Sequence, residues 1–413
     1  MRYKNINNSL FKKNRKKLQD KLSENEIAVL FSASPKHRNG DQFFKYRQDS
    51  DFFYFSGIEQ EESVLIVSKT KEFLFILKPD KKTEIWEGKK LTINESSDIS
   101  GIEKVYYKND FYDILKSIIS KKNTFFIQKT DNKNIRNFKS YLKKHKKNFI
   151  VKNISDISTK LRLIKEPEEI EIIKKAVSIT GKAFDELLKN IRPGMYEYEL
   201  EAIVTKVFIE NGAAGHAYEP IVASGKNACF LHYIKNDDLL KDNELVLFDI
   251  GAEYANYAAD LSRTIPSNGK FTSAQKDLYN AVLDVQQELI ATEYVPGNTI
   301  ENINKKSAEL MEQKMIELGL FTKEEAQKSK DKTPLYFKYF MHGTSHFMGL
   351  DVHDCGTKTT KLQAGMILTC EPGLYIAERS TGIRIENDIL ISNNGAIDLM
   401  ADIPVKINDL EVL

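Results

Sequence analysis

The sequence predicts a protein of mixed α/β and α+β class, with an N-terminal α/β domain followed by a larger α+β domain. Two observations lead to this fold class. In the first 150 residues, short apolar runs alternate with amphipathic helical patterns, which is typical of an α/β domain. In the later part, long helical patterns precede pairs of apolar runs that end in acidic residues. A chain of 413 residues is long enough for two or three domains of roughly 150 residues each.

The N-terminal part contains the elements of one α/β domain. We expect strands at residues 27–31, 63–67, 72–77 and 124–128, and helices at residues 10–22, 111–119 and 134–144. The pattern changes after the segment NISDIS, and Pro167 with the acids behind it is typical of a helix start. We therefore place the domain boundary near Ser155, which gives domains at residues 1–155 and 156–413.

The second part is predicted to consist of two halves, each with helices followed by a pair of strands. In the first half, helices at residues 168–189 and 197–210 precede strands near Val246 and Thr264. In the second half, a helix at residues 273–294 precedes strands near Ile367 and Ile385.

Composition limits the classes of partner. The chain has 61 basic and 59 acidic side chains, so its net charge of +2 indicates neither a nucleic-acid partner nor a membrane partner. The basic run at residues 12–17 continues into a helical pattern and is predicted to be a solvated helix face. No apolar stretch approaches the roughly 18 residues of a membrane span, so we expect a cytoplasmic protein. Cys229, Cys355 and Cys370 lack a CxxC spacing and are interpreted as packing residues.

Two aspartates define the first candidate site. Asp249 ends the apolar run LVLF, and Asp260 precedes the run LSRTIP. If the two runs form an antiparallel hairpin that turns near Tyr254 and Ala255, the two carboxylates lie opposite each other on one face. They would repel unless a positive group lies between them, and a hard divalent cation fits this place well. A salt-bridged or surface hairpin explains this stretch equally well.

The C-terminal part repeats the pattern and favours the metal. Glu371 ends a second apolar strand before a Pro-Gly turn, while Arg384 and Glu386 are predicted to share one face of a strand. Each half then supplies two inward acids. Four carboxylates around one cavity need roughly two divalent ions for balance, and paired metals are a known hydrolytic device.

A nitrogen ligand for such a site is available nearby. The segment HGTSHFMGLDVHD contains His342, His346 and His353, three of the seven histidines of the chain. Three histidines so close together beside glycines are not typical of a core. The pair His342 and His346 lacks the glutamate of an HExxH zinc motif, which excludes that class of site.

Taken together, these motifs resemble the pita-bread metallopeptidases, and within them the aminopeptidase P group. The resemblance rests on the order of the acids and His346, on the flanks CEPGLY and GIRIEND, and on NGDQFFKYRQDSDFFYFSGIEQEESVL and EIWEGKKL in the N-terminal part. It implies two metal ions, usually manganese, bridged by Asp260 and Glu386 and completed by Asp249, His346 and Glu371. It further implies that His232, His342 and His353 surround the substrate, that Arg384 supports the site, and that a homodimer or homotetramer forms in which a neighbour's N-terminal domain borders the active site. Trp86 is a candidate for that contact, and a surface or core aromatic is the equal alternative.

The family also implies a reaction and a substrate. A hydroxide bridging the ions attacks the peptide bond, Glu371 shuttles its proton, and His353 stabilises the charged carbonyl oxygen. The substrates are peptides with proline at the second position. Three alternatives stay open: a noncatalytic pita-bread binding protein, a methionine aminopeptidase, and a prolidase. A prolidase needs a positive group for the carboxylate of the released proline, and Arg379 is a candidate for that role.

Overall fold

The computed structural model describes residues 3, 6–130, 132–329 and 333–411, and the chain divides into two compact units. One unit comprises residues 4–162, and the other comprises residues 1–3 and 163–413. The division falls within α7 (Ser155–Leu163), the helix that follows the first sheet. The domain limits 1–155 and 156–413 remain a prediction.

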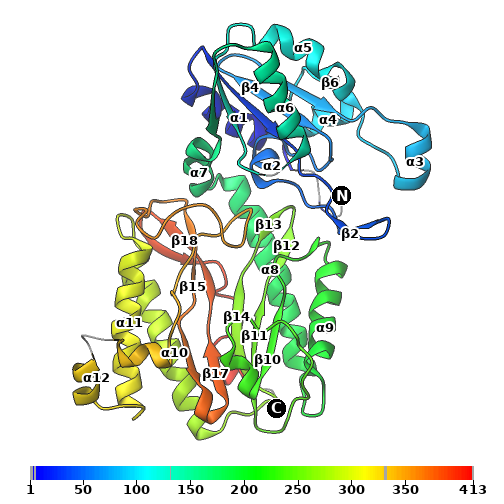
Figure 1. Cartoon of the computed structure of the whole chain (residues 1–413). Helices are drawn as coiled ribbons and strands as arrows, with labels where there is room; N and C mark the ends of the chain where they lie inside the picture. Colours follow the sequence, from blue (N-terminus) through cyan, green and yellow to red (C-terminus); the bar gives the residue numbers. More distant parts are fainter. Residues whose placement is uncertain (1–2, 4–5, 131, 330–332, 412–413) are drawn as a thin grey trace. The chain divides into compact units, whose positions relative to one another are not determined.

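The first unit is built on a mixed six-stranded sheet (Figure 1). Its strand order is β6–β5–β4–β1–β7–β8, with β1 antiparallel to β4 and parallel to β7. The strands are β1 (Glu26–Phe31), β4 (Val64–Ser68), β5 (Glu72–Ile76), β6 (Val105–Tyr107), β7 (Thr124–Ile127) and β8 (Ile150–Asn153). The helices are α1 (Ser9–Lys21), α2 (Ser50–Ser56), α3 (Lys81–Glu87), α4 (Ile93–Ser100), α5 (Phe111–Ile118) and α6 (Lys133–His145), and a short ribbon joins β2 (His37–Asn39) to β3 (Gln42–Phe43).

The basic run of α1 differs from its prediction at two residues. Lys12, Lys13 and Lys16 are exposed, as expected, but the Asn14 and Arg15 side chains are buried. The Arg15 Nε donates to Glu72 Oε2 over 2.9 Å, and Nη1 donates to the carbonyl of Phe55 over 2.9 Å. The interpretation as a solvated face is therefore wrong for Arg15, because a guanidinium with these partners is stabilised inside the unit.

The second unit contains five helices of seven or more residues among its described residues, and small antiparallel sheets lie between them (Figure 1). The helices are α8 (Pro167–Asn190), α9 (Glu197–Glu210), α10 (Ser273–Thr292), α11 (Ile300–Glu317) and α12 (Lys323–Ser329). The sequence did not lead us to predict α11, although Thr299 caps it and Ile303, Ser307 and Met311 recur at helical spacing on its buried face. None of the helices among the described residues is long and apolar enough to span a membrane.

The first half of this unit carries two three-stranded sheets. The sheet β10–β11–β14 contains β10 (Ile221–Ser224), β11 (Leu245–Ile250) and β14 (Leu261–Pro266), and the sheet β13–β12–β9 contains β9 (Gly215–His216), β12 (Ala252–Tyr254) and β13 (Tyr257–Ala258). The turn is formed by Ala255 and Asn256, whose φ values are +52° and +67°. This turn sets a register in which Asp249 pairs with Ser262. The prediction that Asp249 lies directly opposite Asp260 is wrong, since Asp260 lies at the diagonal position.

The second half has a break between two ladders. One sheet is β15–β18–β19, with β15 (Ile367–Cys370), β18 (Asn387–Ser392) and β19 (Gly395–Asp398), and the other is β16–β17, with β16 (Gly373–Ile376) and β17 (Thr381–Arg384). The first ladder ends at the pair Cys370 and Asn387, and the second begins at the pair Gly373 and Arg384. Glu386 thus lies between β17 and β18. The prediction that Glu386 lies within a strand, on the same face as Arg384, is wrong. Both Glu371 and Glu386 fall in the break.

Candidate active site

The carboxylates of the first half share one hydroxyl partner. Asp249 lies on β11 and Asp260 just before β14, and the Tyr218 hydroxyl oxygen is 2.6 Å from Asp249 Oδ1 and 2.5 Å from Asp260 Oδ1. A phenol has one proton and cannot donate to both acids at once. The two side chains therefore converge on one point even though they are not a directly opposed pair.

Arg384 connects the two halves. Its Nη2 lies 2.6 Å from Asp249 Oδ2, and its Nε donates to the Ser262 hydroxyl over 2.7 Å. The same hydroxyl donates to Glu386 Oε2 over 2.8 Å. Arg384 and Ser262 thus link Asp249 in the first half with Glu386 in the second. The supporting role that the resemblance implies for Arg384 stays a prediction.

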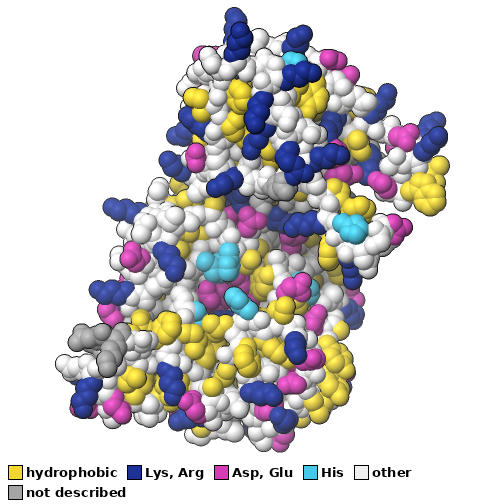
Figure 2. All heavy atoms as spheres, in the orientation of Figure 1, with side chains coloured by type: hydrophobic (Ala, Val, Ile, Leu, Met, Phe, Trp, Pro, Cys, Tyr) yellow, Lys and Arg dark blue, Asp and Glu magenta, His cyan; other side chains and the backbone are white. Residues whose placement is uncertain are grey.

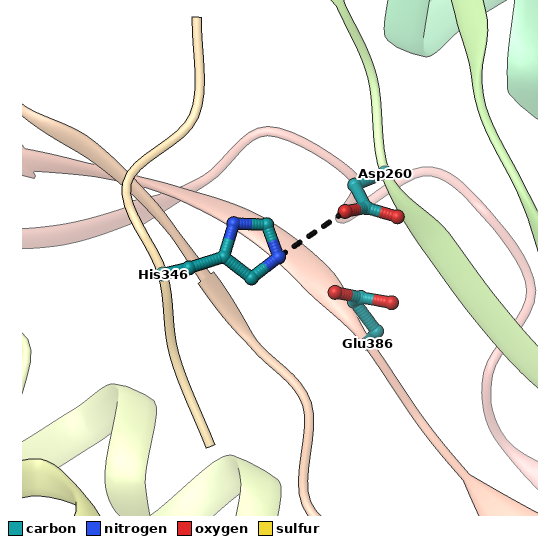
Figure 3. A group of neighbouring side chains, drawn as sticks. All are labelled: Asp260, His346 and Glu386. Atoms are coloured by element: carbon teal, nitrogen blue, oxygen red, sulfur yellow. Dashed lines mark ion pairs between the residues drawn. The ribbon is translucent and has the colours of Figure 1, made fainter. Parts of the chain in front are cut away.

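His346 faces the acids from the loop that precedes β15. Its Nε2 lies 3.3 Å from Asp260 Oδ2 and 3.7 Å from Glu371 Oε1. The donor atoms of Asp260, His346 and Glu386 all lie within 4.8 Å of one another (Figure 3). Three of the five predicted ligands therefore form one compact donor group, and Asp249 and Glu371 flank it through the contacts given above.

Burial dominates the electrostatics of these acids. It raises the pKa of Glu371 to about 7, with the nearby acids adding to the shift and His346 and Arg384 opposing it. Burial and the charges of Asp260 and Glu371 also raise the pKa of Glu386 well above its ordinary value. Burial alone would lower the pKa of His346, but the hydrogen bond to Asp260 and the charge of Glu371 outweigh it and raise that pKa to about 9. The site strongly favours additional positive charge.

The other predicted histidines lie around this centre. His342 Nε2 is 2.8 Å from the Tyr375 hydroxyl, and burial followed by the charge of Arg384 lowers the pKa of His342 to about 4. The His353 ring centroid lies 4.1 Å from that of His346, and burial lowers the pKa of His353. His232 is exposed and lines the same cavity as these histidines.

A cavity of about 480 Å³ brings these groups together. Figure 2 shows histidine and acidic side chains gathered in a hollow of the surface. The five predicted ligands and all three other predicted histidines line the cavity, and Ile221, Leu231, Ile234 and Val352 supply apolar walls. Trp86 lies on α3 of the other unit, where its side chain is 88% exposed.

Two tyrosines of the site were missed by the sequence analysis. Tyr218 lies in the segment AYEPIVAS, which has no metal-ligand spacing, so no local signal marks it. Tyr375 belongs to the recognised segment CEPGLY, and its hydroxyl accepts from Arg384 Nη1 over 3.0 Å while contacting His342. Only the folded arrangement reveals either contact.

The donor set fits hard divalent cations. Carboxylate oxygens with one imidazole suit ions such as Mn²⁺ or Mg²⁺ better than soft, thiolate-seeking metals. Asp249, Asp260, Glu371 and Glu386 bring four acids to a centre in which Arg384 is already engaged by Asp249. Added positive charge would offset the cost of ionising these buried acids.

Two protein-family models match the chain. Residues 171–393 match the metallopeptidase family M24, and residues 11–127 match the N-terminal domain of aminopeptidase P. The chain therefore belongs to metallopeptidase family M24. This finding confirms the predicted order of an N-terminal α/β domain and a pita-bread catalytic domain.

Similarity to named relatives extends over nearly the whole length. The chain is 32% identical to the Xaa-Pro aminopeptidase of Escherichia coli, over 99% of this chain and 98% of that protein. The solved E. coli aminopeptidase P with the inhibitor Pro-Leu has a TM-score of 0.91 at 32% identity, covering 99% of this chain and 98% of that one. The proline aminopeptidase P II of Yersinia pestis has a TM-score of 0.90 at 31% identity, covering 98% of each chain. The predicted resemblance to the aminopeptidase P group and the prediction of a peptide-hydrolysing enzyme are confirmed.

Proposed function

We propose that this protein is a dinuclear-metal aminopeptidase that hydrolyses the peptide bond before a proline at the second position. The observation that carries the proposal is the convergence of Asp260, His346 and Glu386 within 4.8 Å, flanked by Asp249 and Glu371 in one cavity. Full-length similarity to Xaa-Pro aminopeptidases supports the choice of substrate. A noncatalytic pita-bread protein would not need this complete donor set, and methionine aminopeptidases generally lack a full N-terminal domain.

The five ligands divide between two ions in this proposal. Asp260 and Glu386 would hold both ions, Asp249 would help to hold one of them, and His346 and Glu371 would help to hold the other. When bound, such ions supply Lewis-acid chemistry that activates water and polarises a carbonyl. The free amine of the substrate is attracted to the acid-rich centre, which places the N-terminus of the peptide there.

Protein side chains handle the proton and the developing charge. Glu371 accepts a proton from the attacking water and delivers it to the leaving nitrogen. His353 lies in the same cavity and donates to the substrate carbonyl as its oxygen gains charge, while His342 and His232 surround the substrate. The apolar wall formed by Ile221, Leu231 and Ile234 receives the uncharged parts of the peptide. Arg384 holds Asp249 in place.

The test compares peptide lengths with and without metal. Manganese-loaded protein should release the first residue from Xaa-Pro-Yaa tripeptides and longer peptides, and exhaustive chelation should abolish the reaction until Mn²⁺ is added back. Active protein without bound transition metal in elemental analysis would contradict the dinuclear site.

The same assay decides between an aminopeptidase and a prolidase. Turnover of Xaa-Pro dipeptides with none of tripeptides would assign a prolidase instead. The charged groups to test in that case are Lys358, which lines the cavity, and Arg379, which is exposed in the turn before β17.

The remaining parts of the proposal concern the cellular form. Manganese is the proposed metal, the cytoplasm the proposed location, and a homodimer or homotetramer the proposed assembly. The exposed Trp86 supports an assembly in which this residue borders the active site of a neighbouring subunit. The balanced net charge of +2 supports the absence of nucleic-acid and membrane partners.

A further inference from the structure

Gln286 is a buried amide that the proposed reaction does not use. It lies on α10 with 2% of its surface exposed. Its Nε2 donates to two backbone carbonyls, that of Cys370 over 3.1 Å and that of Ile385 over 3.0 Å. Each carbonyl belongs to the residue directly before a proposed metal ligand, Glu371 in one case and Glu386 in the other.

The two carbonyls lie at the edges of the break between the two ladders. The β15–β18 ladder ends at Cys370 and Asn387, and the β16–β17 ladder begins at Gly373 and Arg384. A buried carbonyl without a partner costs about 1 to 3 kcal/mol. Gln286 donates to one buried carbonyl at each edge of the break through a single NH₂ group, and so links both backbone segments to α10.

The same two peptide groups are also held from their opposite sides. The amide N–H of Glu371 donates to the carbonyl of Thr344 over 2.9 Å, and the amide N–H of Glu386 donates to the carbonyl of Ser262 over 3.0 Å. A peptide group is planar, so hydrogen bonds at both its C=O and its N–H fix the rotation of that plane. The orientation of this plane sets the direction in which the next Cα–Cβ bond leaves the backbone.

We propose that Gln286 is a positioning residue that aims Glu371 and Glu386 at the metal centre. The inference rests on the proposed metal site and extends it to a residue outside the cavity. Gln286 touches neither ligand side chain and acts through the backbone. A purely structural role, the satisfaction of two buried carbonyls, would affect stability and leave metal affinity unchanged.

Gln287 provides a matched control, because it is the next residue on the same helix and is exposed. Gln286→Met keeps the length of the side chain and removes both donors, while Gln287→Met makes the same change on the solvent face. The dissociation constant of Mn²⁺ is measured on full-length protein by competition with a chelator, well below the unfolding temperature. The unfolding temperature of the metal-free variants is recorded in parallel. Gln286→Met should weaken Mn²⁺ binding about 10- to 100-fold, the range typical of outer partners of metal ligands, and Gln287→Met should leave it unchanged.

A second variant covers the case in which Gln286→Met does not fold. Gln286→Glu preserves the size and polarity of the side chain, and its carboxyl group can donate to at most one of the two carbonyls. It should also weaken Mn²⁺ binding. Wild-type Mn²⁺ affinity in a folded Gln286 variant would overturn the positioning role even if the unfolding temperature falls. A wild-type protein that binds no Mn²⁺ would overturn the proposed function itself, so the two failures are distinguishable.

Discussion

The two halves of the second unit each supply two acids to one centre, but they hold those acids differently. In the first half, Asp249 is part of the β11–β14 ladder, which runs from Leu245 to Ile250 on β11, while Asp260 lies just before β14. In the second half, Glu371 and Glu386 lie where one ladder has ended and the next has not begun. A regular strand aims a side chain by its own geometry. Where the ladder is broken, the direction of the side chain must be fixed by other groups.

The two halves are also anchored to their helices by different chemistry. In the first half, the buried Glu169 of α8 accepts a hydrogen bond from the Tyr257 hydroxyl of β13 over 2.9 Å. In the second half, the neutral Gln286 of α10 binds the backbone beside the break. One anchor titrates and the other does not. The comparison teaches that pH should act on the anchor of the first half, Glu169, and that loss of donors should act on the anchor of the second half, Gln286.

The largest expected loss of activity follows from removing a proposed metal ligand from either half, and it tests whether both halves are needed for one site. Asp260→Ala and Glu386→Ala each remove a proposed bridging ligand, one from each half. Each variant should lose peptidase activity to background and weaken Mn²⁺ binding by more than the roughly 100-fold that is typical of outer partners. Metal content by elemental analysis and turnover of an Xaa-Pro-Yaa peptide measure the effect, and Asp242→Ala on the exposed surface is the control. If one variant retained metal and turnover, the two halves would not contribute equally.

A smaller loss is expected where a group assists without holding metal. His353→Ala should lower kcat by about 10² to 10³, since it removes a donor to the charged carbonyl oxygen, and should leave the metal content unchanged. Steady-state kinetics and elemental analysis on the same preparation separate these quantities. Loss of one metal equivalent would make His353 a ligand and change the proposed division of the acids.

The smallest expected effect on turnover concerns the ionisable anchor of the first half. Burial raises the pKa of Glu169 from an ordinary value of 4.5 to about 7. The folded state thus keeps a proton that the unfolded state has released, so this contribution to stability is complete below about pH 4.5 and is lost as the pH rises through 7. Because one pKa unit corresponds to about 1.4 kcal/mol, wild type should lose on the order of 3 kcal/mol relative to Glu169→Gln between pH 4.5 and 8.

Urea unfolding of the metal-free proteins across that pH range measures the difference. The amide of Glu169→Gln can accept from the Glu166 N–H and donate to Tyr257, so both contacts of the carboxyl have a replacement. Glu171→Gln, at an exposed position of the same helix, should follow wild type. If the free energies of unfolding of wild type and Glu169→Gln changed in parallel with pH, Glu169 would not titrate in this range.

Local patterns predicted most of the elements. The helix expected at residues 197–210 has those same bounds in the structure, because a turn of acids and a regular apolar stripe mark it. The strands around Val246 and Thr264 were expected and observed as well. The register was missed, since it depends on the turn at Ala255 and Asn256 and a two-residue shift leaves every side chain on the same face.

Residues that act through long-range contacts escaped the sequence analysis. The partners of Tyr218 are distant in sequence, and their approach depends on how β11 and β14 pack against the segment after β9. Gln286 is one of two adjacent glutamines on α10, and its sequence neighbours give no sign that it meets both Cys370 and Ile385. Burial, which separates Gln286 from Gln287, comes from the packing of α10 and not from the composition of either residue.

The sequence by itself determined the order of the domains, the family, and the types of residue that the centre requires. These properties can be recognised from local periodicity and from short motifs such as CEPGLY and GIRIEND, because neither depends on a distant part of the chain. Only the tertiary structure decided the diagonal placement of Asp249 and Asp260, the ladder break at Glu371 and Glu386, and the buried amide beside it. The physical reason is that such contacts join elements far apart in the chain, and their geometry exists only once the two halves have packed on their helices.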